Sequence, residues 1–143
     1  MSVIDVHVIF ENADGQWLFS RRSNTGYKDG QFSLVAGHLE PDESLKHCAI
    51  REAMEEIGVS IDASSLSLRH VMRRDSDQPR ISFYFQCHAW TGSISNREPH
   101  KCAELVWGHP KTPPAPMVDH VAAAIRLILN GELVGDYSAS QQD

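Results

Sequence analysis

The residues of this chain best suited to chemistry are a group of glutamates at short spacings. Glu55 and Glu56 follow Glu52 by three and four residues, so on a helix that turns ~100° per residue their side chains fall within an arc of about 100°. Like charges at these spacings repel each other. A hard cation such as Mg²⁺ would remove the repulsion, because it prefers carboxylate and phosphate oxygens. A solvated helix face is the alternative interpretation of such a group, so the surrounding residues decide between the two.

The surrounding residues form a longer pattern: Gly, five residues, Glu, seven residues, Arg-Glu, an apolar residue, any residue, Glu-Glu, any residue, Gly, and an apolar residue. Every fixed position is met, at Gly37, Glu43, Arg51, Glu52, Glu55, Glu56 and Gly58, with Val59 last. This stretch resembles the signature box of the Nudix hydrolase (MutT-like) family and covers 23 of the 143 residues. Two departures are the small Ala53 at an apolar position and Val35 where many relatives carry proline.

The resemblance implies an enzyme that cuts a pyrophosphate bond in a nucleoside-diphosphate compound with Mg²⁺, for which Mn²⁺ could substitute. The implied fold is an α/β/α sandwich built on a mixed β-sheet. By resemblance, Glu52, Glu55 and Glu56 surround the metal, with Glu52 and Glu56 as the firmer ligands. The backbone carbonyl of Ala36, just before the box, is a further expected ligand.

Relatives differ in the residue that acts as the general base. Glu55 is the candidate within the box, and Glu98 and Glu104 are the candidates downstream. We favour Glu98 because residues 96–101 have the composition of a mobile loop. Arg51 is expected to orient a box glutamate through a charge-assisted hydrogen bond.

Substrate contacts are expected upstream of the box. Arg22 stands where an arginine touches the substrate in some relatives, and Tyr27 and Tyr84 are the aromatic candidates for stacking on a nucleobase. The chain lacks the marks of relatives that act on ADP-ribose, dinucleoside polyphosphates or coenzyme A. Elimination therefore favours a nucleoside triphosphate, ordinary or modified. The alternatives are a catalytically idle Nudix-fold module that binds a nucleotide, and an unrelated protein with a structural acidic helix.

Hydrophobic periodicity predicts the elements that position these residues. Strands are expected at residues 3–10, 17–21, 32–36, 66–72, 80–90 and 103–107, and helices at 43–57 and 117–130. The first two strands are expected to pair as a hairpin around the turn at 12–15, and residues 73–79 to form a polar connection. On the first helix, Ile50, Ala53, Met54 and Ile57 are expected to dock on the sheet. The order of strands and helices predicts one α/β domain over residues 1–137, followed by a polar tail at 138–143.

Composition limits the ligands and the cellular compartment expected for the chain. The net charge of −6 argues against binding to a nucleic-acid polymer but not against a small phosphorylated ligand, because a bound cation can invert the local sign. The three cysteines lack the spacing of a metal site and indicate free thiols in the cytoplasm. No apolar run has the ~20 residues of a membrane span. The sequence leaves open whether the chain forms a homodimer.

Overall fold

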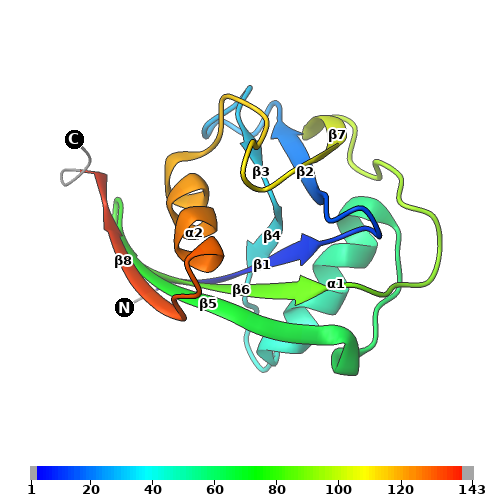
Figure 1. Cartoon of the computed structure of the whole chain (residues 1–143), viewed down its shortest axis with the longest axis horizontal. Helices are drawn as coiled ribbons and strands as arrows, with labels where there is room; N and C mark the ends of the chain where they lie inside the picture. The colour runs from blue at the N-terminus through cyan, green and yellow to red at the C-terminus, as the bar shows by residue number, and fades with distance from the viewer. Residues whose placement is uncertain (1–2, 140–143) are drawn as a thin grey trace.

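The computed structural model describes residues 3–139, which form two β-sheets and two α-helices (Figure 1). The larger sheet has the order β4-β1-β6-β5-β8, and the smaller one the order β3-β2-β7. The larger sheet contains β1 (Val3–Phe10), β4 (Val35–His38), β5 (Leu66–Asp75), β6 (Pro79–Cys87) and β8 (Val134–Ser138). The smaller sheet contains β2 (Trp17–Arg22), β3 (Phe32–Ser33) and β7 (Cys102–Gly108). The helices are α1 (Leu45–Ile57) and α2 (Asp119–Leu129), with a short 3₁₀ turn at Ala63–Ser65.

The larger sheet is mixed, as the sequence predicted. Strand β1 runs antiparallel to β4 and parallel to β6, while β5 runs antiparallel to β6 and parallel to β8. The parallel pairs require connections that cross the sheet. Helix α1 lies on the path from β4 to β5, and α2 on the path from β7 to β8.

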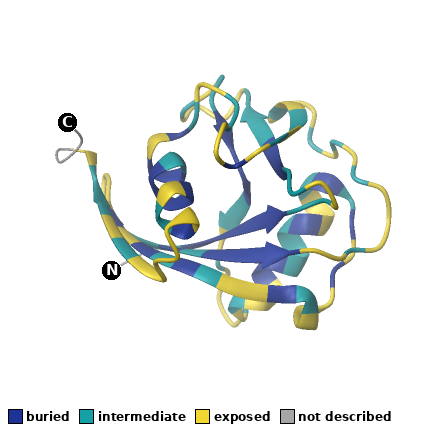
Figure 2. Cartoon of the chain, viewed as in Figure 1, coloured by how far each residue is buried: buried dark blue, intermediate teal, exposed yellow. Residues whose placement is uncertain are grey.

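The two helices cover opposite faces of the larger sheet, which gives the three layers of the predicted sandwich. Alternate residues of β1 enter different cores: Val6 and Val8 pack with α1, and Ile9 packs with α2. This follows from the two-residue repeat of a strand. Burial is accordingly concentrated along the middle of the sheet and on the inner sides of both helices (Figure 2).

The predicted hairpin between the first two strands is wrong. β1 and β2 belong to different sheets and share a single bridge, from Glu11 to Trp17. The predicted turn exists, with the Asn12 amide bonded to the Gln16 carbonyl at 3.0 Å. Both edges of β1 are already occupied by β4 and β6, so the chain after the turn joins the other sheet.

Three further elements differ from the prediction. β5 continues to Asp75, through the first three residues of the segment expected to be a polar connection, because β6 pairs with it over that length. The strand expected at 32–36 is divided at Leu34 between the two sheets. β8 was not predicted, and Ser138, where the tail was expected to begin, is its last residue. Residues 140–143 of that tail lie outside the described residues.

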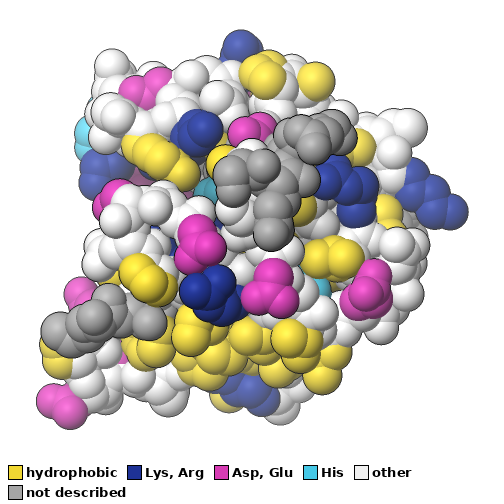
Figure 3. All heavy atoms as spheres, turned by 90° about the vertical axis from the view of Figure 1, so that its left-hand side faces the viewer, with side chains coloured by type: hydrophobic (Ala, Val, Ile, Leu, Met, Phe, Trp, Pro, Cys, Tyr) yellow, Lys and Arg dark blue, Asp and Glu magenta, His cyan; other side chains and the backbone are white. Residues whose placement is uncertain are grey.

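β8 is an edge strand, and only one of its sides is paired. It lies on the side of the molecule that Figure 3 turns toward the viewer, where acidic and basic side chains are interspersed and apolar atoms gather in the lower half. Leu133, just before β8, and Val134, its first residue, are 53% and 67% exposed. Separately, neither helix within residues 3–139 is long and apolar enough to cross a membrane.

Candidate active site

Helix α1 has well-defined ends that fix where its glutamates lie. Ser44 is the N-cap and accepts a hydrogen bond from the His47 amide at 3.1 Å. Gly58 ends the helix with φ at 71°, in the left-handed region that glycine tolerates best. Its backbone also lies against Arg97, so a Cβ there would come within 2.5 Å of the Arg97 Nε.

The buried residues of α1 differ in part from the prediction. Ala53 and Ile57 are buried as predicted, whereas Met54 is 47% exposed. Cys48 and Ala49 are fully buried, although they lie at about the same angle on the helix as the glutamates. β4 covers that side of the helix, and the Cys48 thiol lies 3.9 and 3.6 Å from the Gly37 and His38 carbonyls of β4. The glutamate face therefore lines a cleft between α1 and β4 and is not an open solvated surface.

Within this cleft, Glu52 and Glu56 come together. The Glu52 carboxylate rests on the backbone of Gly37, where an added Cβ would overlap it. One carboxylate oxygen of Glu56, Oε2, is buried and has no hydrogen-bond partner among the described residues. A buried carboxylate oxygen without a partner is costly, and it is the kind of group that a cation would satisfy.

The pKa of Glu56 is raised well above its ordinary value. Burial is the largest cause, followed by a hydrogen bond and charge repulsion from Glu52 and by repulsion from Glu98, while a hydrogen bond from the Ala36 amide opposes the rise. Desolvation and neighbouring negative charge both disfavour ionisation. The structure therefore brings together three carboxylates, from Glu52, Glu56 and Glu98, that resist being charged simultaneously.

Arg51 holds the carboxylates on the outer side of the cleft. Its guanidinium bonds Glu43 at 2.7 and 3.0 Å, Glu52 at 2.5 Å and Glu55 at 3.3 Å. The hydrogen bond from Arg51 lowers the pKa of Glu43 to about 2. The Glu55 side chain is 51% exposed, and the structure places it at the rim beside Arg51 and not with Glu52 and Glu56.

The segment before β7 is attached to the end of α1. The amides of Ser95 and Arg97 bond the carbonyls of Ile57 and Glu56, each at 3.0 Å. These carbonyls belong to the last turn of the helix, which has no intrahelical donors for them. Where the sequence suggested a mobile loop, the structure shows hydrogen bonds that set Glu98 beside Glu56. Glu104, the other downstream candidate, lies within β7 opposite Arg21 and is exposed.

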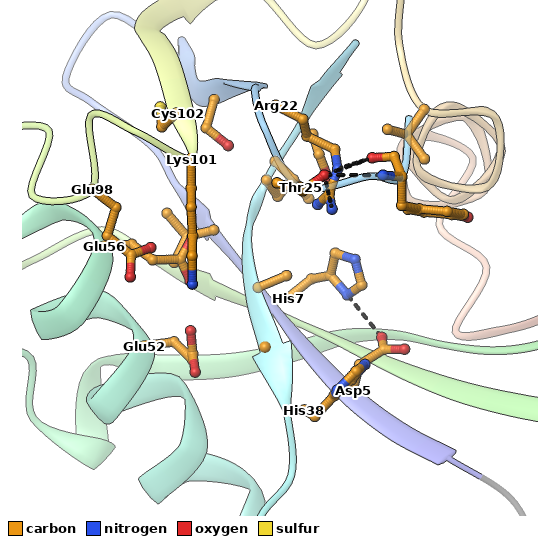
Figure 4. A pocket seen from close by; sticks show the side chains of 18 of the residues that line it. Asp5, His7, Arg22, Thr25, His38, Glu52, Glu56, Glu98, Lys101 and Cys102 are labelled. Carbon is orange, nitrogen blue, oxygen red and sulfur yellow. Dashed lines mark hydrogen bonds and ion pairs between the residues drawn. The ribbon is translucent and has the colours of Figure 1, made fainter. Parts of the chain in front are cut away.

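A cavity of about 890 Å³ extends from these carboxylates across β4 and β1 (Figure 4). Its far end contains polar groups that the sequence analysis did not identify. Arg74 donates to Asp5 and to Ser82, both at 3.1 Å, and His7 lies 3.2 Å from Asp5. Asp5 and His7 interrupt an otherwise apolar strand, a signal that could have identified them as a buried polar pair.

Buried charges at the far end are compensated within the protein. Burial alone would raise the pKa of Asp5, but hydrogen bonds from His7 and Ser82 and the charge of Arg74 lower it below its usual range. Burial, reinforced by the charge of Arg74, lowers the pKa of His120 to about 3, so His120 is neutral at pH 7. The far end thus presents polar groups without a surplus of negative charge.

The loop at 23–30 borders the same cavity and contains Tyr27, and Arg22, the other substrate residue suggested by the sequence, is the last residue of β2 just before it. Arg22 donates to the Tyr27 carbonyl at 2.7 Å and lies 5.4 Å from the centre of the Tyr27 ring. The Tyr27 ring is 45% exposed at the cavity. Tyr84, the other aromatic candidate, is fully buried and stacks on His7 at 4.4 Å, so it cannot contact a ligand.

No group of three or more histidine, cysteine, aspartate or glutamate side chains within residues 3–139 is already arranged as a metal site. Glu52 and Glu56 nevertheless offer the oxygen donors that Mg²⁺ prefers. The unpaired oxygen of Glu56 and the position of Glu52 on Gly37 fit such an ion.

Comparison with known proteins finds one matching family model and a relative of similar length. The NUDIX domain family model matches residues 1–127. The CTP pyrophosphohydrolase of Escherichia coli (strain K12) is 26% identical over 113 residues, which are 78% of this chain and 79% of that protein.

Solved structures resemble this chain over most of its length. The crystal structure of the MutT NUDIX hydrolase from Burkholderia pseudomallei has a TM-score of 0.80 and 19% identity, covering 88% of this chain and 97% of that one. The MutT protein from Methanosarcina mazei Go1 has a TM-score of 0.78 and 20% identity, covering 90% and 94%. At these identities the likeness establishes the fold.

The raised pKa of Glu56 leads to a prediction about stability and pH. The folded chain keeps the Glu56 proton to a higher pH than the unfolded chain, in which the pKa of this carboxyl is near the ordinary 4.5. Metal-free stability should therefore fall as the pH rises above 4.5 toward the raised pKa. Glu56→Gln should remove this part of the pH dependence and leave the metal-free protein as stable as the wild type at pH 7, or more stable.

Melting temperatures measured between pH 4.5 and 8 in EDTA would check this, with Glu104→Gln as the matched control. The same pH dependence in the wild type and in Glu56→Gln would show that folding does not raise the pKa of Glu56.

Proposed function

This chain belongs to the NUDIX domain family, and on that premise we propose that it hydrolyses a phosphoanhydride bond of a nucleoside triphosphate, ordinary or modified, with bound Mg²⁺. The observation that carries the proposal is the buried Glu56 carboxylate, which has an unpaired oxygen and lies beside Glu52 in a cleft open to the cavity. That site combines a need for a cation with room for a polyphosphate.

We assign Glu52 and Glu56 as the metal ligands, together with the carbonyl of Ala36. The Ala36 amide bonds Glu56, and the N–H and C=O of one strand residue point to the same side. The Ala36 carbonyl is therefore directed toward the same carboxylates. When bound, Mg²⁺ would neutralise phosphate oxygens and activate water. Glu55 is at best an outer ligand, since Arg51 holds it at the rim.

Arg51 acts in this proposal as a positioning residue. It bonds Glu52 from outside the cleft, which fixes one carboxylate oxygen and leaves the other directed inward. Glu43 in turn fixes Arg51 through two hydrogen bonds.

Glu98 is the proposed general base. It lines the cavity next to Glu56, and repulsion between the two appears in the raised pKa of Glu56. A carboxylate in this position could accept a proton from a water held near the metal. The hydrogen bonds from Ser95 and Arg97 to α1 keep Glu98 there.

The far end of the cavity and the loop at 23–30 are proposed to hold the nucleoside. Asp5, His7 and His120 offer hydrogen-bonding groups without a net charge that would repel the ligand. The exposed Tyr27 ring, flanked by Arg22, offers a stacking surface. The similarity to a CTP pyrophosphohydrolase supports a nucleoside triphosphate as the substrate class.

The first prediction from the proposed function concerns the reaction itself. Purified protein with Mg²⁺ or Mn²⁺ should release phosphate or pyrophosphate from at least one member of a panel of nucleoside triphosphates, and EDTA should abolish the release. Glu56→Gln should lower the rate about a thousandfold, because loss of the cation removes several kcal/mol at the transition state. Nucleotides that raise the melting temperature of the wild type without being hydrolysed would indicate an idle binding module and contradict the proposal.

The second prediction separates the two downstream glutamates. Glu98→Gln should lower kcat by about two to four orders of magnitude, the usual contribution of a general base, while Glu104→Gln should leave kcat within about twofold. Steady-state rates across pH would check this. Equal kcat values in the two variants would remove Glu98 from the mechanism.

The third prediction concerns Tyr27. Tyr27→Ala should raise KM about tenfold, since stacking on a base contributes ~1–3 kcal/mol, with kcat little changed. Tyr27→Phe should behave like the wild type because stacking does not use the hydroxyl. An unchanged KM in Tyr27→Ala, measured on the best substrate of the panel, would show that the ring does not contact the nucleotide.

A further inference from the structure

Four lysine and arginine side chains line the cavity, and three of them already have partners. Arg22 bonds the Tyr27 carbonyl and Thr25. Arg74 bonds Asp5 and Ser82, and Arg80 bonds Asp77 at 3.1 Å. The fourth is Lys101. Its ammonium group forms no hydrogen bond or ion pair with any residue between 3 and 139.

The base of the Lys101 side chain is held firmly. The Lys101 amide bonds the Glu98 carbonyl at 2.8 Å, and the Lys101 carbonyl accepts from the Ser23 amide at 2.9 Å. These bonds tie the residue before β7 both to the Glu98 segment and to the end of β2. In Figure 4 the Lys101 side chain extends from this point into the cavity, toward the region where Glu52 and Glu56 face each other.

The absence of a pair with the carboxylates limits what Lys101 can do. A lysine that neutralised Glu52 or Glu56 would compete with a metal ion for the same oxygens. The Lys101 ammonium instead lies more than 4.0 Å from every carboxylate oxygen of the described chain, since no ion pair of Lys101 is formed. It is a cation directed into a cavity, beside a site that would hold a second cation.

From this geometry we infer that Lys101 binds the phosphate chain of the substrate on the side opposite the glutamates. The inference rests on the proposed function. A triphosphate carries more negative charge than one divalent ion neutralises, and the remaining charge needs a second positive group. An ammonium on a flexible stem donates up to three hydrogen bonds and acts as a point charge toward phosphate. Lys101 would thus bind phosphate oxygens that the metal does not cover.

The test compares Lys101→Met with Lys111→Met. Both changes remove one lysine charge and both lysines are exposed, but Lys111 lies in the turn after β7 and does not line the cavity. The probe is the α,β-methylene analogue of ATP, whose α–β linkage cannot be hydrolysed, titrated by calorimetry in Mg²⁺ after a check that no phosphate is released from it. Lys101→Met should weaken its binding about ten- to a hundredfold, the range expected for a lost hydrogen bond to a charged group. Lys111→Met should leave it within about twofold.

Two further measurements keep the inference falsifiable. Lys101→Arg, which keeps the charge, should retain binding within about fivefold. Binding of Mn²⁺ alone to Lys101→Met should be as tight as in the wild type or tighter, because a nearby positive charge has been removed. Unchanged binding of the analogue in Lys101→Met, an equal loss in Lys111→Met, or a tenfold loss of Mn²⁺ affinity would each overturn the inference.

These binding measurements need no turnover, so they separate the inference from the proposed function. A protein that binds the analogue through Lys101 but hydrolyses no nucleotide would contradict the proposed reaction and leave the phosphate contact established. If the Lys101→Met variant hydrolysed nucleotides at the wild-type KM, the proposed reaction would be supported and the phosphate contact of Lys101 would be contradicted.

Discussion

The structure depends on holding several carboxylates closer together than their charges favour. Glu56 is buried, its Oε2 has no partner, and both Glu52 and Glu98 raise its pKa. In the metal-free chain this arrangement costs stability, which the packing around it must offset. Gly37 contributes by lacking the side chain that would displace Glu52, and the well-packed core under α1 keeps the helix against β4.

Arg51 shows how the chain divides its carboxylates into two groups. The outer group is Glu43 and Glu55, and the inner group is Glu52, Glu56 and Glu98. Arg51 bonds both members of the outer group, and the pKa of Glu43 falls to about 2 as a consequence. It reaches the inner group only through one oxygen of Glu52. A second arginine facing Glu56 would have stabilised the metal-free protein but occupied the place of a cation. The helix therefore carries its stabilising ion pairs on one side of the cleft and its unsatisfied charge on the other.

The sequence predicted the parts of this arrangement that depend on local spacing. The glutamates of α1, its end at Gly58 and the mixed sheet with two helices follow from periodicity and from the box, whereas the helix begins at Leu45, two residues later than expected. The hairpin failed because the choice of partner strand depends on edges that β4 and β6 occupy, both distant in sequence. Met54 was wrongly expected to dock on the sheet, because a helical wheel gives the angles of side chains but does not show which side of the helix β4 covers. The contacts of Asp5 with Arg74 and of Arg97 with Glu56 join segments that no local pattern relates.

The two ends of the cavity differ in how their charges are balanced, and this difference can orient a substrate. At the far end, Arg74 and His7 compensate Asp5, and His120 is neutral, so a ligand meets directional polar groups without net repulsion. At the near end, Arg51 pairs with one oxygen of Glu52, and the remaining carboxylate charge repels an anion until a metal binds. A polyphosphate is therefore excluded from the far end by the lack of free positive charge and admitted to the near end only together with a cation. The same asymmetry makes metal binding a condition for correct placement of the ligand as well as for the reaction, because without the metal the carboxylate charge at the near end outweighs the single positive charge of Lys101.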